Sequence, residues 1–127
     1  MLNLLLIGFK PSKEFEKALT KKGIQLTFSK TLAGIPNDCT PDITAFYLST
    51  SKDISKLQAL KMTYPKTWLC VVVEKAHLNN AKSYTALLED TAKDAVWLKQ
   101  SWQELLWFHI ETMNRFQTLS KQSLGSV

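Results

Sequence analysis

The sequence predicts a single α/β domain, a five-stranded, doubly wound parallel sheet with helices on both of its faces. Three observations predict it. Short apolar runs that suit buried strands alternate with segments whose apolar residues recur at helical spacing. The connections between these segments are short, as expected for strands linked through helices. A length of 127 residues, with 45% hydrophobic and 21% charged residues, is also typical of one globular domain.

The first segments already show this alternation. Residues 2–9 form a continuous apolar run, which suits a strand buried on both faces. Residues 11–23 are expected to form a helix, because proline suits a first helical turn and Gly23 a C-terminal stop. In residues 24–28 apolar and polar side chains alternate, which indicates a second strand.

The rest of the chain repeats the pattern. Residues 31–40 contain only a weak helical turn, around residues 32–35, because Pro36 interrupts it. Further strands are expected at residues 42–50, 68–73 and 95–98, and further helices at residues 51–64, 76–91 and about 101–121. The domain is therefore expected to span residues 1–121, followed by a frayed tail at residues 122–127.

Composition excludes several classes of protein. The net charge is +5, but Arg115 is the only arginine, whereas nucleic-acid readers rely on arginine forks, so we expect no nucleic-acid partner. The cysteines and histidines show no metal-ligand spacing, and two cysteines are too few for a disulfide scaffold. No apolar run approaches the ~20 residues of a membrane span, and residues 1–9 lack the basic start of a signal peptide. We expect a cytoplasmic protein with no membrane partner.

Several short motifs lie in the order of a known family. Residues 4–11 form an apolar strand that ends in a loop with a proline, Pro41-Asp42 precedes the third strand, and Tyr64-Pro65 precedes the fourth. Over about residues 2–110 this order resembles the receiver domain of two-component response regulators. The resemblance implies a receiver (flavodoxin-like) three-layer sandwich, extended here by a long C-terminal helix, and a bacterial signal transduction protein.

The family's phosphorylation chemistry can be compared position by position. A receiver uses two acids to hold Mg²⁺, an aspartate to accept the phosphoryl group, a Thr or Ser after the fourth strand and a Lys after the fifth. The residues at these positions here are Gly8, Phe9, Tyr47, Val73 and the pair Leu98-Lys99. Phe and Tyr side chains cannot replace carboxylates as Mg²⁺ ligands. The resemblance therefore implies a non-phosphorylatable pseudo-receiver, with no catalytic residue, metal or cofactor.

Other polar residues at the same sheet edge leave alternatives open. Tyr47 can act as a hydrogen-bonding plug or merely fill space, and Lys10 can enter the emptied pocket or remain in solvent. Ser49 and Thr50 can hold an anion or cap the next helix, and Glu74 can pair with Lys10 or Lys99. The alternative function is a small ligand- or nucleotide-binding protein that uses this edge. The loop after the first strand, however, lacks the glycines of a phosphate cradle.

The last helix carries more apolar residues than one face can hold. One stripe contains Trp102, Leu105, Leu106, His109, Met113 and Phe116, and a second set contains Trp107, Phe108 and Ile110. Because a sheet covers one side of a helix, we expect a homodimer through the other side, or a partner such as a kinase, phosphatase, cyclase, transcription factor or effector domain. The expected interface residues are Trp97, Trp102, Leu106, Trp107, Phe108, Ile110 and Met113.

Overall fold

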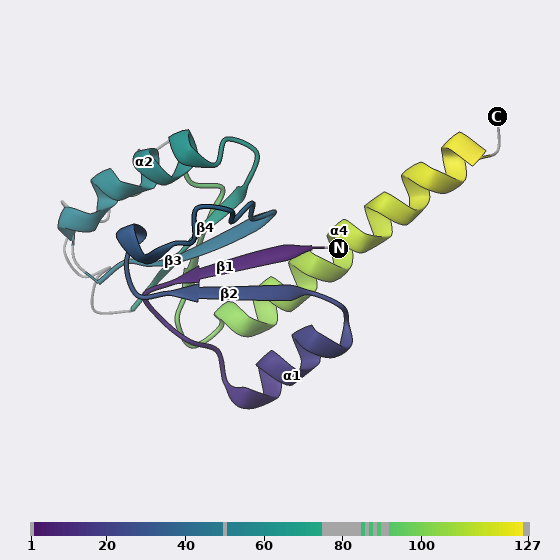
Figure 1. Cartoon of the computed structure of the whole chain (residues 1–127), viewed down its shortest axis with the longest axis horizontal. Helices are drawn as coiled ribbons and strands as arrows, with labels where there is room; N and C mark the ends of the chain where they lie inside the picture. Colours follow the sequence, from purple (N-terminus) through teal and green to yellow (C-terminus); the bar gives the residue numbers. More distant parts are fainter. Residues whose placement is uncertain are drawn as a thin grey trace.

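The computed structural model describes residues 2–49, 51–74, 85, 87, 89 and 92–125, and for residues 51, 52 and 116–125 only the backbone. Five strands form one parallel sheet in the order β2-β1-β3-β4-β5, which confirms the predicted fold class (Figure 1). The strands are β1 (Asn3–Ile7), β2 (Gln25–Ser29), β3 (Ile43–Tyr47), β4 (Trp68–Val73) and β5 (Ala95–Leu98).

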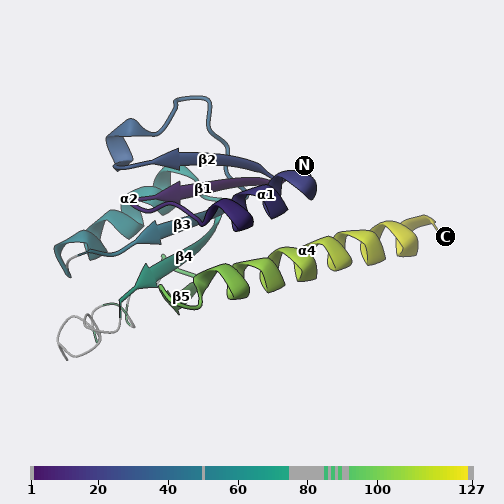
Figure 2. The same cartoon turned by 90° about the horizontal axis from the view of Figure 1, so that it is seen from below.

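Helices lie on both faces of this sheet. Helices α1 (Lys13–Lys21) and α4 (Trp102–Gly125) lie on one face, and α2 (Ser55–Thr63) lies on the other (Figures 1 and 2). Short 3₁₀ turns occur at Leu32–Gly34 (η1) and Ser51–Ile54 (η2). The helix expected over residues 76–91 falls mainly outside the described residues, although Thr85, Leu87 and Glu89 are helical.

Each face of the sheet has its own hydrophobic core, because successive strand side chains point to opposite faces. Leu4 and Leu6 of β1 join the α4-side core, together with Leu19, Leu106 and Ile110 of the helices. The intervening residues of β1 join the α2-side core with Leu57, Leu60 and Leu87. The two cores make the predicted three-layer sandwich.

The α1 segment begins at its cap and not at the proline. The Ser12 side chain accepts a hydrogen bond from the Phe15 backbone N–H at 3.2 Å, and the helix starts at the next residue, Lys13. An N-cap of this kind satisfies one of the amide groups that a helix start leaves unpaired. At the other end Gly23 adopts φ +78°, the left-handed conformation that favours glycine after a helix.

Two connections differ from the simple alternation. Between β2 and β3 the chain forms only the η1 turn, as the interruption by Pro36 predicts, so no α-helix covers this part of the α2-side core. The last helix is longer than the expected end at about residue 121, since α4 continues to Gly125. The physical reason is that no proline or glycine occurs between residues 101 and 124 to end the helix.

The C-terminal part of α4 extends past the end of the sheet (Figures 1 and 2). Trp102, Leu106 and Ile110 are buried against the strands, and they lie in the first half of the helix. Among the described residues, no helix has the length and apolar character needed to cross a membrane.

Candidate functional site

The candidate site lies where β1 and β3 end side by side. Ile7 pairs with Phe46 in the sheet, so Gly8 and Tyr47 follow at the same edge. Gly8 has φ +88°, and its N–H donates a 2.9 Å hydrogen bond to the Ser29 carbonyl. A Cβ on Gly8 would lie 3.4 Å from the Tyr47 Cβ. Glycine therefore suits this position through both its backbone conformation and the close approach of β3.

The Phe9 side chain turns inward from this edge. Phe9 is 8% exposed, and its ring centroid lies 4.7 Å from that of Trp102, which it meets edge-on. The distance to the centroid of the Tyr47 ring is 5.9 Å. Phe9 thus extends the α4-side core up to the sheet edge, where the receiver family has an acid.

Three polar side chains form a cluster at the edge, the Tyr47–Glu74–Lys99 cluster. The Tyr47 hydroxyl donates a hydrogen bond of 2.5 Å to Glu74 Oε1. Lys99 Nζ lies 3.4 Å from the same oxygen and 5.1 Å from the centroid of the Tyr47 ring. Because the hydrogen bond to Glu74 favours the neutral phenol, it raises the pKa of Tyr47 to about 12, with smaller effects from burial and from the Glu74 charge.

The register of the last two strands places the other two members of this cluster. Val73 of β4 pairs with Leu98 of β5, so the residues that follow them, Glu74 and Lys99, emerge together. The Lys99 N–H also donates to the Val73 carbonyl at 2.8 Å. Val73 itself is buried in the α2-side core, where it offers no hydroxyl to a phosphoryl group.

Two of the expected edge residues have partners elsewhere. Lys10 is exposed, and its Nζ lies over the Phe28 ring, 4.9 Å from its centroid, which agrees with the alternative that this lysine remains in solvent and not with the one that it enters the pocket. A cation over the face of an aromatic ring is attracted by the ring's quadrupole. Ser49 Oγ donates to the Asp53 carboxylate at 2.9 Å. Thr50 lies outside the described residues.

The Tyr47–Glu74–Lys99 cluster has no net charge, because the charges of Glu74 and Lys99 cancel and the Tyr47 phenol is neutral. Its one carboxylate, Glu74, accepts from a phenol and pairs with a lysine. Within the described part of the chain, no group of three His, Cys, Asp or Glu side chains is placed to hold a metal ion. A divalent cation needs several oxygen ligands with net negative charge, and the described residues of this edge do not provide them.

The structure divides the expected interface residues into buried, exposed and partly covered groups. Trp102, Leu106 and Ile110 are buried in the chain's own core, so they are not available to a partner. The expectation that Ile110 belongs to a second face of α4 is therefore wrong, because a spacing of four residues keeps it on the side of Leu106. Phe108 is 71% exposed and Leu105 39% exposed on the outer side of the helix.

Trp107, Trp97 and Met113 are partly covered by the protein itself. The Trp107 indole N–H donates to Glu111 at 2.9 Å, and Lys22 Nζ lies 4.7 Å from the centroid of the indole. The Trp97 ring packs on Trp68 with a centroid distance of 5.4 Å. Met113 packs against the α4-side core. These three side chains are therefore only partly available to a partner.

His109 also has an intramolecular role that the sequence did not indicate. Its ring stacks on Trp68 with centroids 3.8 Å apart, and its Nε2 is buried with no hydrogen-bond partner among the described residues. Burial lowers the pKa of His109 below 6.5, and the negative charge of Asp94 offsets part of this effect.

Protonation of His109 is expected to destabilise the fold. At pH values above 6.5, the pKa of His109 in the unfolded chain, the histidine is neutral in both the folded and the unfolded chain. As the pH falls, the unfolded chain takes up the proton first. The free energy of unfolding, measured with urea from about pH 7 to about pH 5, should therefore decrease. The His109→Gln variant should lose part of this pH dependence. If the free energy of unfolding of His109→Gln depended on pH as much as that of the native chain, His109 would not be buried in its neutral form.

Comparisons with known proteins agree with this architecture. No family model and no curated protein matches the chain. Among solved structures, the chain is similar to a response regulator protein from Burkholderia pseudomallei, whose crystal structure contains a phosphorylated aspartic acid, a calcium ion and citrate. The sequence identity is 15%, the TM-score is 0.57, and the match covers 78% of this chain and 60% of the other, so this chain spans less than two thirds of that protein's length. The chain thus has the flavodoxin-like fold of a response-regulator receiver domain.

Proposed function

We propose that this protein is a non-phosphorylatable pseudo-receiver, a regulatory signalling module that acts through protein–protein contacts and catalyses no reaction. The observation that carries the proposal is the hydrogen bond from Tyr47 to Glu74 at the end of β3. At this position the receiver family has the phosphoacceptor aspartate.

The chemistry of the edge supports this proposal. Aspartyl phosphorylation needs a carboxylate nucleophile and a divalent cation to neutralise the phosphoryl oxygens. The Tyr47 phenol is neutral at physiological pH, because its pKa is raised to about 12. Lys99 already pairs with Glu74, which leaves the cluster close to electrical neutrality. The module therefore holds one conformation at this edge without a phosphoryl switch.

Phosphoryl transfer tests the first part of the proposal. The chain is incubated with acetyl phosphate and Mg²⁺, beside a phosphorylatable receiver domain as positive control. We expect no hydroxylamine-labile phosphate on this chain and no change of melting temperature with beryllofluoride and Mg²⁺. A labile phosphate, or a Mg²⁺-dependent shift with beryllofluoride, would overturn the pseudo-receiver assignment.

We further propose that the contacts are made by the outer face of α4, and that the first partner is a second copy of the chain. Leu105 and Phe108 are exposed apolar side chains one helical turn apart on this face. An exposed phenylalanine on a helix is a common anchor of protein interfaces. An effector domain, or a kinase, phosphatase, cyclase or transcription factor, would use the same face of the module or of its dimer.

Sedimentation equilibrium tests the dimer. We expect the native chain to self-associate and Phe108→Asp to raise the dimer dissociation constant about tenfold or more. Met62→Asp is the matched control, since Met62 is 81% exposed on α2, on the opposite face of the sheet. Equal effects of the two variants, or a native chain that stays monomeric, would contradict an interface on α4.

A further inference from the structure

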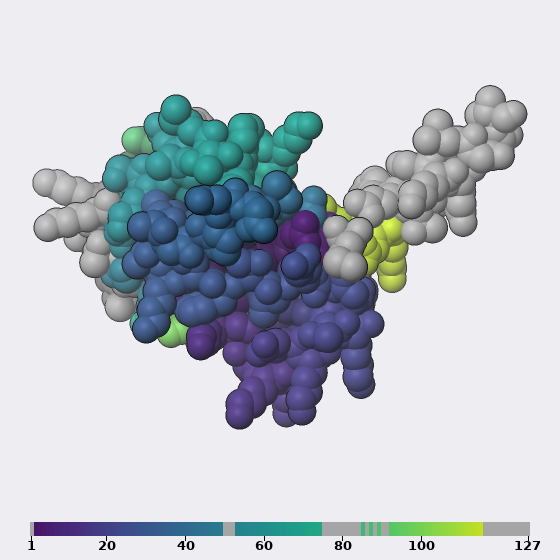
Figure 3. Space-filling model, in the orientation of Figure 1, coloured from purple at the N-terminus to yellow at the C-terminus, as the bar shows by residue number. Residues whose placement is uncertain are grey.

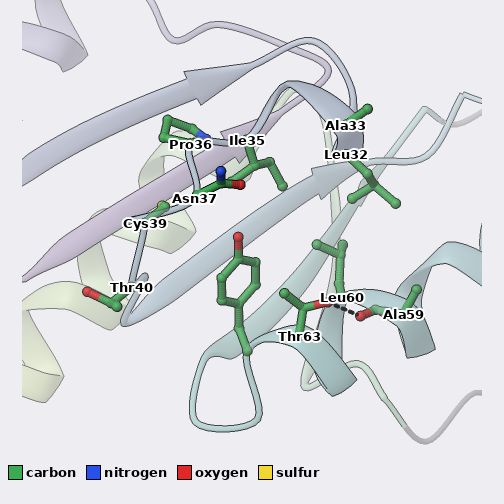
Figure 4. A pocket seen from close by; sticks show the side chains of 11 residues that line it. Leu32, Ala33, Ile35, Pro36, Asn37, Cys39, Thr40, Ala59, Leu60 and Thr63 are labelled. Atoms are coloured by element: carbon green, nitrogen blue, oxygen red, sulfur yellow. Dashed lines mark hydrogen bonds between the residues drawn. The ribbon is translucent and has the colours of Figure 1, made fainter.

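A groove lies on the α2 side of the molecule, apart from the Tyr47–Glu74–Lys99 cluster. Its volume is about 550 Å³, and it runs between the β2–β3 connection and α2 (Figure 4). Leu32, Ile35 and Pro36 line it from the connection, and Ala59 and Leu60 from the helix. In the space-filling view the connection (blue) lies directly beside the surface of α2 (teal) (Figure 3).

The groove exists because the β2–β3 connection contains no α-helix. The η1 turn and the hydrogen-bonded turn that follows Pro36 are narrower than a helix, so they leave one flank of α2 uncovered. Leu60 is buried, and Leu32 and Ile35 pack against the α2-side core, which makes the floor of the groove a part of that core. An indentation with a rigid apolar floor is suited to a ligand, and not only to solvent.

The lining determines the chemical class of the ligand. None of the described residues that line the groove carries a charge at neutral pH, and its neutral polar groups come from Asn37, Thr40, Thr63 and Tyr64. Thr63 is already used, because its hydroxyl donates to the Ala59 carbonyl at 2.9 Å (Figure 4). An ionic ligand would lose hydration here without a counter-charge. The groove therefore favours a neutral molecule that carries both apolar and hydrogen-bonding groups.

We propose that this groove is a binding site for a neutral small molecule with an apolar body, which presents a hydrogen-bonding group to Asn37 or Thr40. The volume falls within the range of about 300–1,000 Å³ that small-molecule sites occupy. This site shares no residue with the sheet edge, so it goes beyond the proposed function and does not depend on it.

Two cysteines make the site measurable in the intact protein. The sequence holds Cys39 and Cys70 only. Cys70 is fully buried, whereas Cys39 is partly exposed and lines the groove. Burial raises the pKa of both thiols, so labelling is slow and needs an alkaline buffer. Alkylation of the folded chain by iodoacetamide is therefore a specific report on access to the groove.

Nile red, a neutral apolar dye, is the first probe. We expect saturable fluorescence enhancement with one site per chain. Ala59→Trp should raise its dissociation constant about tenfold or more, because an indole at this position fills the groove. Gln58→Trp is the matched control, since Gln58 is the exposed neighbour in α2 and does not line the groove. Saturating dye should slow alkylation of Cys39 in the native chain and in Gln58→Trp, but not in Ala59→Trp.

Several outcomes would overturn this proposal. They are the absence of saturable binding, equal binding by folded Ala59→Trp, and tighter binding of the anionic dye anilinonaphthalene sulfonate than of Nile red. Weaker self-association of Ala59→Trp in sedimentation would assign the groove to a second copy of the chain instead. If circular dichroism shows that Ala59→Trp is unfolded, Ala33→Trp blocks the groove from the opposite wall and replaces it.

Discussion

Replacement of Leu106 by alanine is expected to lower the free energy of unfolding by about 2–5 kcal/mol, the range measured when large aliphatic side chains are deleted from protein cores. Leu106 is fully buried in the α4-side core, where it joins the helix to β1, β3 and β4. Its removal leaves a cavity that the packed strands cannot close. Urea denaturation, monitored by circular dichroism, measures the change.

Phe108→Ala is the matched control on the same helix. Phe108 is two residues away but 71% exposed, so its truncation in the monomer should change the free energy of unfolding by less than about 0.5 kcal/mol. The pair tests the rotation of α4 about its axis. If Phe108→Ala destabilised the monomer as much as Leu106→Ala, the assignment of the inner and outer faces of α4 would be wrong.

The second large effect concerns the ionisation of Tyr47. Its phenol should titrate at a pKa of about 12, two pH units above an ordinary tyrosine, because Glu74 accepts its proton in a hydrogen bond. The sequence has three tyrosines, so the ultraviolet difference between the native chain and Tyr47→Phe isolates this titration. Glu74→Gln should return the pKa of Tyr47 toward the ordinary value, since a neutral amide no longer opposes the phenolate.

The same shift predicts a loss of stability at alkaline pH. Below about pH 10 the phenol is protonated in both the folded and the unfolded chain, and its contribution to stability is fully present. Above that pH the unfolded chain ionises first, so the contribution is lost between pH 10 and about 12. Tyr47→Phe should lack this part of the alkaline decline. A native pKa near 10, or an alkaline decline that Tyr47→Phe shares in full, would contradict the hydrogen bond to Glu74.

The strands illustrate how much of the fold could be predicted. The apolar runs at residues 68–73 and 95–98 coincide with β4 and β5, whereas residues 2–9 and 42–50 form strands only over Asn3–Ile7 and Ile43–Tyr47. Strand periodicity and apolar runs report burial and not hydrogen bonding, so they extend past the point where the ladder ends. Phe9 is an example, since it is buried but lies beyond β1.

The sequence could not predict which of several possible partners a charged side chain contacts. Lys10 and Lys99 were equal candidates for Glu74, and the structure pairs Glu74 with Lys99 while Lys10 lies over Phe28. The groove beside α2 had only one signal in the sequence, the proline that interrupts residues 31–40. A missing helix can be predicted from such a signal, but the space that it leaves depends on how its neighbours pack.

The sequence by itself determined the order of strands and helices, and it showed that the first and third strands end without acids, because parallel strands end at a common edge whatever their exact register. The tertiary structure alone decided which groups meet there. Tyr47 and Glu74 are 27 residues apart in the chain, and their hydrogen bond depends on the register of β3 with β4. The buried face of α4 likewise depends on the rotation of the helix against the sheet. Both are set by packing between distant segments. Local periodicity placed Trp102 and Leu106 on the sheet-facing stripe of α4, but it could not decide that Ile110 is buried and Leu105 exposed.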